Sequence, residues 1–266
     1  MAVELRRSSE FSRRDLAAIF TASYQDYFVP FKVDEDTLDY MVDAFDLLLA
    51  HSLVAVEAGV AVGLANLGRR GEQTWVGGVG VIPARRGAGI GEQLMSELFG
   101  RARDLGSTEM VLEVITENAP AISLYDKLGF EVVRELEVLS LAQAEGGGEA
   151  EEVEAGQARR LIARRREQPE PWQRGDKTVA NLARRDPPPH GLVAGEAAAV
   201  FRADGSRVGL LQAAGDRNGL RTLISALRSR GTLSAVNYPS DGAVAAGLRE
   251  AGAEVALRQL EMTLEL

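Results

Sequence analysis

The 266-residue chain contains no cysteine and only two histidines, His51 and His190. The absence of cysteine excludes disulfide bonds, thiolate metal sites and a cysteine nucleophile. The histidines lie far apart in the sequence, without a partner at metal-ligand spacing. No apolar run is long enough to span a bilayer, and the first residues lack the apolar core of a signal peptide. We therefore expect a cytoplasmic protein with no metal and no membrane contact.

The chain also lacks an excess of basic residues, because its formal net charge is −9 at pH 7. An acidic chain is a poor partner for nucleic acid, so we expect no nucleic-acid binding. A cationic acceptor molecule would suit this charge, although acidic surfaces are common for solubility alone. The length is comfortable for two domains.

The most informative segment is 79–91, with the sequence VGVIPARRGAGIG. It joins an apolar β-branched run, a proline break and a glycine-rich basic turn, and an amphipathic helix pattern follows. A bare loop at a helix N-terminus presents unpaired N–H groups and the positive end of the helix dipole to an anion. Glycine lets the backbone approach such a ligand, and Arg86 adds a guanidinium. The segment therefore predicts a phosphate-bearing ligand.

Two common phosphate motifs do not fit this loop. A Walker loop needs Lys-Ser/Thr after its last glycine, whereas Gly91 is followed by Glu92, and the glycine spacing does not match the dinucleotide fingerprint. Residues 86–91 do fit Arg-x-x-Gly-x-Gly. Residues 118–130 fit Asn-x-x-Ala-x-x-Leu-Tyr-x-x-x-Gly-Phe. Together these motifs resemble the GNAT superfamily of acyl-CoA-dependent N-acyltransferases, over roughly residues 1–141 and most specifically over 79–130.

The resemblance implies acetyl-CoA as co-substrate, with no metal. It assigns the pyrophosphate to a loop made of Arg86, Gly87, Ala88, Gly89, Ile90 and Gly91. It assigns the pantetheine arm to the end of the preceding strand and to the start of a later helix, at Val79, Val81, Asn118 and Ala121. For Arg86 the alternative is a surface arginine at a turn.

The resemblance also suggests the catalytic groups. Tyr125 matches the family's general acid, since a phenol can protonate a departing thiolate. The alternative is a buried tyrosine that packs under the loop. Glu113 resembles the glutamate that acts as base through water in peptide N-terminal acetyltransferases of the superfamily. The alternative is a strand glutamate that faces solvent.

The acceptor is expected to enter over the first helices, where we predict substrate-binding residues at Tyr24, Asp26, Tyr27 and Phe28. Aromatic rings with one carboxylate suit an amine with an apolar body, and the alternative is a hydrophobic hinge. The function implied is direct transfer of an acetyl group to a primary amine of a small molecule, a peptide N-terminus or a lysine. The alternative is a non-catalytic acyl-CoA-binding sensor. Acceptor identity and acyl chain length stay open.

The second half of the chain repeats the order of elements of the first half. We therefore expect an α/β fold with a mixed sheet, in which a catalytic GNAT domain (1–143) and a Gly/Glu linker (144–156) precede a smaller, degenerate GNAT-like domain (157–266). Leu248 stands where the first copy has Tyr125, and Asp241 stands where it has Asn118. The alternating run 254–264 would also allow a homodimer through a sheet edge.

Overall fold

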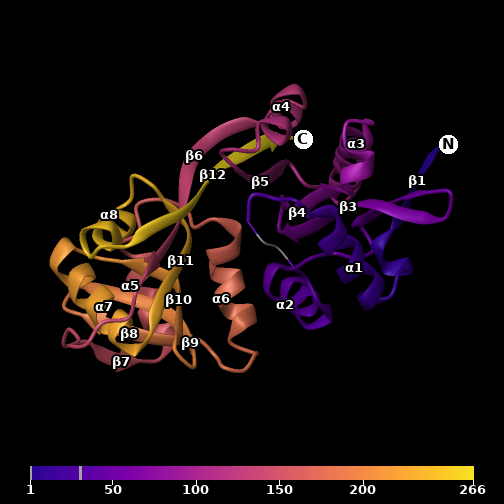
Figure 1. The fold of residues 1–266 in the computed structure, drawn as a ribbon. Coiled ribbons are helices and arrows are strands. Elements are labelled where there is room, and N and C mark those ends of the chain that lie inside the picture. Colours follow the sequence, from indigo (N-terminus) through magenta and orange to yellow (C-terminus); the bar gives the residue numbers. More distant parts are fainter. Residues whose placement is uncertain (1, 30–31) are drawn as a thin grey trace. The chain divides into compact units, whose positions relative to one another are not determined.

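A computed structural model describes residues 2–29 and 32–266. The chain divides into two compact units (Figure 1). Unit 1 comprises Met1–Val133 together with Met262–Leu266, and unit 2 comprises Arg134–Glu261. Within the described ranges, no helix has both the length and the apolar character needed to cross a membrane.

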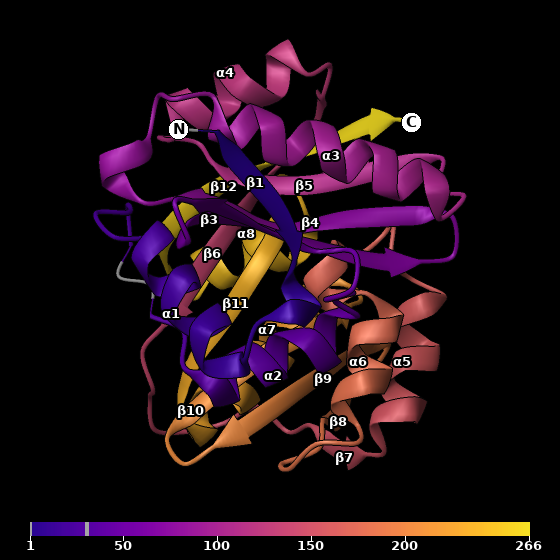
Figure 2. The same cartoon turned by 90° about the vertical axis from the view of Figure 1, so that its right-hand side faces the viewer.

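Unit 1 is a mixed sheet with helices on both faces. Its strands lie in the order β1-β2-β3-β4-β5, and the end of β12 lies next to β5. Only the β4–β5 pair among these five strands is parallel. Figure 2 shows α3 on one face and α1 and α2 on the other. The elements are β1 (Val3–Arg7), α1 (Arg13–Ser23), α2 (Glu35–Phe45), β2 (Leu53–Glu57), β3 (Val60–Arg70), β4 (Gln73–Val81), α3 (Ile90–Asp104), β5 (Glu109–Ile115), α4 (Ala119–Lys127) and the start of β6 (Glu131–Leu141).

Local sequence signals account for the helices of unit 1. The Ser12 side chain caps α1 by accepting the backbone N–H of Asp15 at 3.1 Å, which is typical of serine at a helix start. Helix α3 buries one apolar stripe completely against the sheet, because its apolar residues recur at helical spacing. The residues of this stripe are Leu94, Met95, Leu98 and Ala102.

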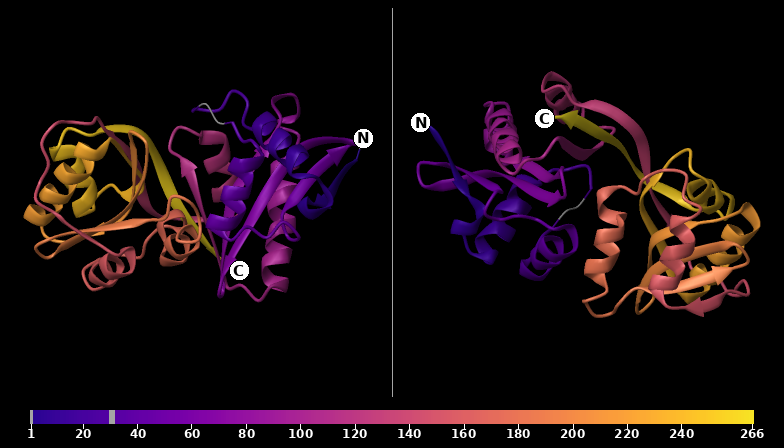
Figure 3. Two further views of the ribbon diagram at one scale, coloured as in Figure 1. Left: turned by 90° about the horizontal axis from the view of Figure 1, so that it is seen from below. Right: turned by 180° about the vertical axis from the view of Figure 1, so that it is seen from behind.

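Unit 2 has the same architecture. Its strands lie in the order β6-β11-β10-β9-β8-β7, and β10 and β11 form the parallel pair. The elements are β7 (Glu151–Val153), α5 (Ala155–Ala163), α6 (Asp176–Leu182), β8 (His190–Ala194), β9 (Ala197–Asp204), β10 (Arg207–Ala214), α7 (Arg217–Arg230), β11 (Thr232–Pro239), α8 (Ala243–Glu250) and β12 (Glu254–Glu265). Two further views show its strands with helices on either side (Figure 3).

Both faces of the unit 2 sheet are buried. Along β9, Ala199 and Phe201 belong to a core that includes residues of α7 and α8. The intervening Ala198 and Val200 belong to a second core that includes residues of α5 and α6. This alternation follows from the two-residue period of a strand, and it explains why residues 197–201 of β9 are all apolar.

The two units repeat one plan, but each takes its sixth strand from the other half of the sequence. The order β1-β2-β3-β4-β5 is completed by the end of β12, and the order β7-β8-β9-β10-β11 is completed by β6. The unit boundaries fall at 133/134 and 261/262, outside the segment 144–156 expected as the linker. Part of that segment is β7, which pairs with β8. The roles predicted for 1–143 and 157–266 stay predictions.

Candidate active site

The candidate site of unit 1 lies where two parallel strands part. Residues 73–75 of β4 pair with residues 109–111 of β5, and no further pair forms between the two described strands. Opposite β3, the pairing shifts between Val76 and Val79, so that β4 carries an extra residue at Gly77–Gly78. Gly78 has φ +129°, a backbone conformation that favours glycine. This bulge marks the point beyond which β4 has no partner on the β5 side.

The end of helix α1 packs directly onto this glycine run. A Cβ on Gly78 would lie 2.8 Å from the Tyr24 hydroxyl, and one on Gly80 would lie 2.7 Å from Cβ of Ser23. The Tyr24 hydroxyl donates to the carbonyl of Val79 at 3.4 Å. The glycines are therefore required by the close approach of α1 to the strand.

The predicted pyrophosphate loop is open. Gly87 and Gly89 have φ +75° and +78°, and a Cβ added to either would meet nothing within 4 Å. Gly89 is the N-cap of α3 and supplies no side-chain cap, so the first-turn N–H groups have no side-chain acceptor there. Gly87, Ala88 and Gly89 are exposed, whereas the Ile90 side chain is buried in the core. Only the backbone of Ile90 is therefore placed to face a ligand.

Arg86 links this loop to the segment after α1. Its Nε donates to the carbonyl of Val81 at 3.1 Å. Its Nη2 donates to the carbonyls of Ser23 and Gln25 at 3.2 and 2.6 Å. These contacts engage two of its three nitrogens with backbone, so that the expected phosphate contact of Arg86 stays a prediction. The Val81 and Val79 carbonyls, both predicted to lie along the pantetheine arm, each accept a side-chain donor of unit 1.

Three tyrosines gather beside the parted strands. The rings of Tyr24 and Tyr27 are 4.9 Å apart and edge-on. Burial, with smaller contributions from Tyr27 and Tyr125, raises the pKa of Tyr24 well above its usual value. Tyr125 lies on α4 and is 7% exposed. Burial raises its pKa, and the nearby Tyr27 adds a smaller rise. All three hydroxyls are therefore neutral donors at physiological pH.

Asn118 connects α4 to this cluster. Its Oδ1 caps the helix by accepting the N–H of Ala121 at 3.4 Å. Burial raises the pKa of Tyr27, and a hydrogen bond with the Asn118 side chain partly offsets this rise. Asn118 is thereby held between the start of α4 and a residue of the predicted acceptor segment.

Glu113 has a partner that the sequence reasoning missed. Its Oε2 accepts the indole N–H of Trp75 at 2.8 Å, and the Trp75 ring packs edge-on to Phe45 at 5.6 Å. Glu113 is half-buried rather than fully exposed to solvent. Trp75 and Glu113 lie on neighbouring strands, so only the strand register could have revealed this pair.

Most of the predicted acceptor residues line one open pocket. Tyr24, Asp26 and Tyr27 border a pocket of about 360 Å³ at the end of α1. Asp26 has φ +60° and is exposed. Phe28 does not line the pocket and is 51% exposed, although its ring lies 5.4 Å from that of Tyr27. No cluster of His, Asp or Glu suited to a metal ion occurs among residues 2–29 and 32–266.

Comparison with known proteins finds acetyltransferases among the similar proteins. The Acetyltransferase (GNAT) family matches residues 15–130. The L-methionine sulfoximine/L-methionine sulfone acetyltransferase of Salmonella typhimurium is 35% identical over 109 residues, which is 39% of this chain and 64% of that relative. The match thus spans less than two thirds of the relative's length.

Solved structures resemble the whole chain. A GCN5-related N-acetyltransferase from Sphaerobacter thermophilus aligns with a TM-score of 0.73 at 15% identity, covering 99% of this chain and 95% of that one. A tandem GNAT protein from the clavulanic acid biosynthesis pathway aligns with a TM-score of 0.65 at 13% identity, covering 99% and 98%. Residues 15–130 of unit 1 thus match the GNAT acetyltransferase family, and the fold of the tandem GNAT protein extends over the whole chain.

The raised pKa values predict that the tyrosines of this cluster ionise at a higher pH in the folded chain than in the unfolded chain. In the unfolded chain tyrosine is half-ionised near pH 10, whereas Tyr24, Tyr27 and Tyr125 stay neutral there in the folded chain. Because these folded pKa values are raised, their contribution to stability is fully present below about pH 10 and is lost as the pH rises further. Absorbance at 295 nm, followed with pH in native buffer and in denaturant, measures this difference. Tyr125→Phe is expected to remove one of the tyrosines that ionise well above pH 10. If the variant instead loses a tyrosine that ionises near pH 10, the raised pKa of Tyr125 is wrong.

Proposed function

We propose that the protein is an acetyl-CoA-dependent N-acetyltransferase that transfers an acetyl group directly to a primary amine. The observation that carries this proposal is the open glycine loop at the uncapped start of α3, next to the parted ends of β4 and β5. Backbone N–H groups at a helix N-terminus favour phosphate oxygens. A Cβ added to Gly87 or Gly89 would meet nothing within 4 Å, which supports room for a pyrophosphate beside this loop.

Binding would rest mainly on backbone groups. The N–H groups of residues 87–91 hold the pyrophosphate, and the unpaired β5-facing side of β4 at Val79 and Val81 runs beside the pantetheine arm. Asn118 and Ala121, at the start of α4, border the same arm. The bonds of Arg86 to the carbonyls of Ser23 and Gln25 keep the loop joined to the acceptor segment. The site is therefore preorganised before the substrates arrive.

Tyr125 would supply the proton for the departing thiolate. Its burial keeps the hydroxyl protonated at neutral pH, which is the state that a general acid needs. Glu113 would receive a proton from the acceptor amine through water. The indole N–H of Trp75 donates to one carboxylate oxygen of Glu113 at 2.8 Å and holds the carboxylate in place.

The acceptor would enter at the pocket lined by Tyr24, Asp26 and Tyr27. The carboxylate of Asp26 attracts a cationic amine, while the two rings contact its apolar part. The matched relative from Salmonella is named for L-methionine sulfoximine and L-methionine sulfone, which are amino acids with a free amino group. Amino acids and peptide N-termini are therefore the acceptors to screen first, with release of free thiol from acetyl-CoA as the readout.

The loop assignment predicts a specific effect at Gly89. Gly89→Ala places a Cβ at φ +78°, which costs about 1–2 kcal/mol for a left-handed residue and shifts the backbone that faces the phosphates. We expect acetyl-CoA affinity, measured by calorimetry, to fall about tenfold or more. Gly100→Ala in the same helix meets nothing within 4 Å and is the matched control with unchanged affinity. Wild-type affinity in the Gly89 variant would exclude the loop as the pyrophosphate site.

The acid assignment predicts a loss of turnover without a loss of binding. Tyr125→Phe keeps the ring contact with Phe130 but removes the hydroxyl. General acids contribute about 10²–10⁴-fold, so kcat is expected to fall by that range. Acetyl-CoA affinity should barely change. Full turnover in this variant, under conditions where chemistry limits the rate, would make Tyr125 a packing residue.

The base assignment predicts a change in the pH–rate profile. Without a base, the rate depends on the fraction of acceptor amine that is already neutral, and this fraction falls as the pH drops. Glu113→Gln is therefore expected to lose most activity at low pH. Glu109→Gln is the control, since Glu109 lies on the same strand but bonds to Gln73 and Thr263. If the two variants give the same profile, the base lies elsewhere.

A further inference from the structure

Unit 2 contains a pocket at the place that corresponds to the parted strands of unit 1. Residues 207–210 of β10 pair with residues 232–235 of β11, after which the two strands separate. A cavity of about 100 Å³ lies at their ends, bordered also by residues 165–170, Arg174 and the first turn of α8. The loop before α7 differs from that of unit 1, because the Asp216 side chain caps the helix by accepting the N–H of Gly219 at 2.6 Å. Asp216 lies at the helix start that corresponds to the predicted pyrophosphate loop of unit 1.

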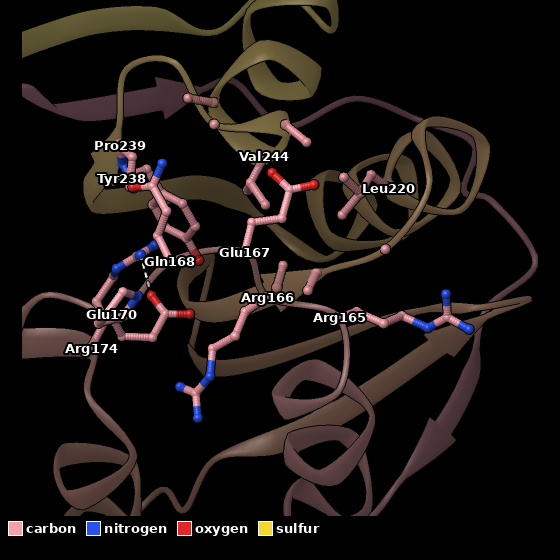
Figure 4. Close-up of a pocket in the computed structure, with 17 residues that line it drawn as sticks. Arg165, Arg166, Glu167, Gln168, Glu170, Arg174, Leu220, Tyr238, Pro239 and Val244 are labelled. Atoms are coloured by element: carbon pink, nitrogen blue, oxygen red, sulfur yellow. Dashed lines mark hydrogen bonds and ion pairs between the residues drawn. The ribbon is translucent and has the colours of Figure 1, made fainter.

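One wall of the pocket carries hydrogen-bond donors that have no acceptor. Arg174 is only 4% exposed, and its Nη2 donates to Glu170, but its Nε and Nη1 have no hydrogen-bond partner. Its guanidinium carbon lies 3.4 Å from the ring centre of Tyr238. Tyr238 is 2% exposed, and its hydroxyl interacts with the Arg174 side chain. Figure 4 shows Arg174, Glu170 and Tyr238 together on one side of the pocket.

The start of helix α8 adds further donors. Gly242 is its N-cap and provides no side-chain acceptor. The first-turn residues Ala243, Val244 and Ala245 line the pocket, so their N–H groups and the positive end of the helix dipole lie at its edge. A buried donor that lacks an acceptor is energetically unfavourable. The pocket therefore favours a ligand that accepts hydrogen bonds and carries negative charge.

The rest of the lining limits what this anion can be. Leu220 and Val244 lie on the side opposite Tyr238 and Arg174 and form an apolar wall (Figure 4). At the rim, Arg165 and Arg166 are already in ion pairs, with Glu196 at 3.0 Å and Asp176 at 2.5 Å. Glu167 and Glu170 also border the pocket and disfavour a multiply charged anion.

We infer that the unit 2 pocket binds a small monocarboxylate with a short aliphatic tail. The carboxylate accepts from Arg174, Tyr238 and the start of α8, and the tail contacts Leu220 and Val244. Burial raises the pKa of Tyr238, so that its hydroxyl stays a donor over the physiological range. The site is separate from acetyl transfer and does not depend on the function proposed for unit 1.

The test uses the full chain, because unit 2 includes β6 and most of β12. Sodium butyrate is titrated by ligand-observed NMR, with inorganic phosphate as the second probe and with coenzyme A present to occupy unit 1. Tyr238→Phe removes one donor and keeps the ring, so we expect butyrate to bind about tenfold more weakly. Ala243→Leu enlarges an exposed side chain at the pocket edge and should abolish binding. Ala183→Leu is the matched control, since Ala183 is exposed in unit 2 and does not line the pocket.

Loss of butyrate binding in Ala243→Leu, with retention in Ala183→Leu, supports the inference. Three results would overturn it. These are no butyrate binding to the wild-type chain, equal binding in the Tyr238 and Ala243 variants and the wild type, or phosphate binding with the same sensitivity to both variants. Thermal unfolding of each variant shows that the fold is kept.

Discussion

The parting of β4 from β5 is the constraint on which the candidate site depends. Gly77 and Gly78 add a residue to β4, and Gly78 takes a positive φ that side chains resist. The end of α1 then packs against the bare backbone through Ser23 and Tyr24. This contact brings the segment after α1 to the end of β4, where the glycine loop and α3 begin. With this packing, the Tyr24 hydroxyl and the Arg86 guanidinium bond to carbonyls of the same stretch of β4, at Val79 and Val81.

The repeated plan separates architecture from chemistry. Both units have a parallel pair of strands that part near their ends, and both have a helix after the first of these strands. In unit 1 that helix begins at an uncapped glycine, Gly89, which leaves room for an anion. In unit 2 it begins at Asp216, whose carboxylate caps the helix itself. The two helix starts therefore differ in that Asp216 already places a carboxylate at the first-turn N–H groups, whereas Gly89 places none.

The exchange of β6 and β12 makes the two units depend on each other's sequence. A fragment that starts at residue 157 lacks β6 and β7, and one that ends at residue 143 lacks the strand that lies next to β5. Each fragment would then expose a sheet edge that is paired in the whole chain, and such edges favour aggregation. The sequence repeat alone gives no sign of this exchange.

The sequence by itself determined the order of the elements, the glycine loop and the motif that contains Asn118 and Tyr125. These features depend on neighbouring residues, so short-range patterns reveal them. Only the tertiary structure decided that Trp75 holds Glu113 across 38 residues and that Arg86 reaches the carbonyl of Gln25 across 61. Such contacts depend on strand register and on the packing of distant segments. Short stretches of sequence do not reveal such contacts, because many strand registers would bury the same apolar residues.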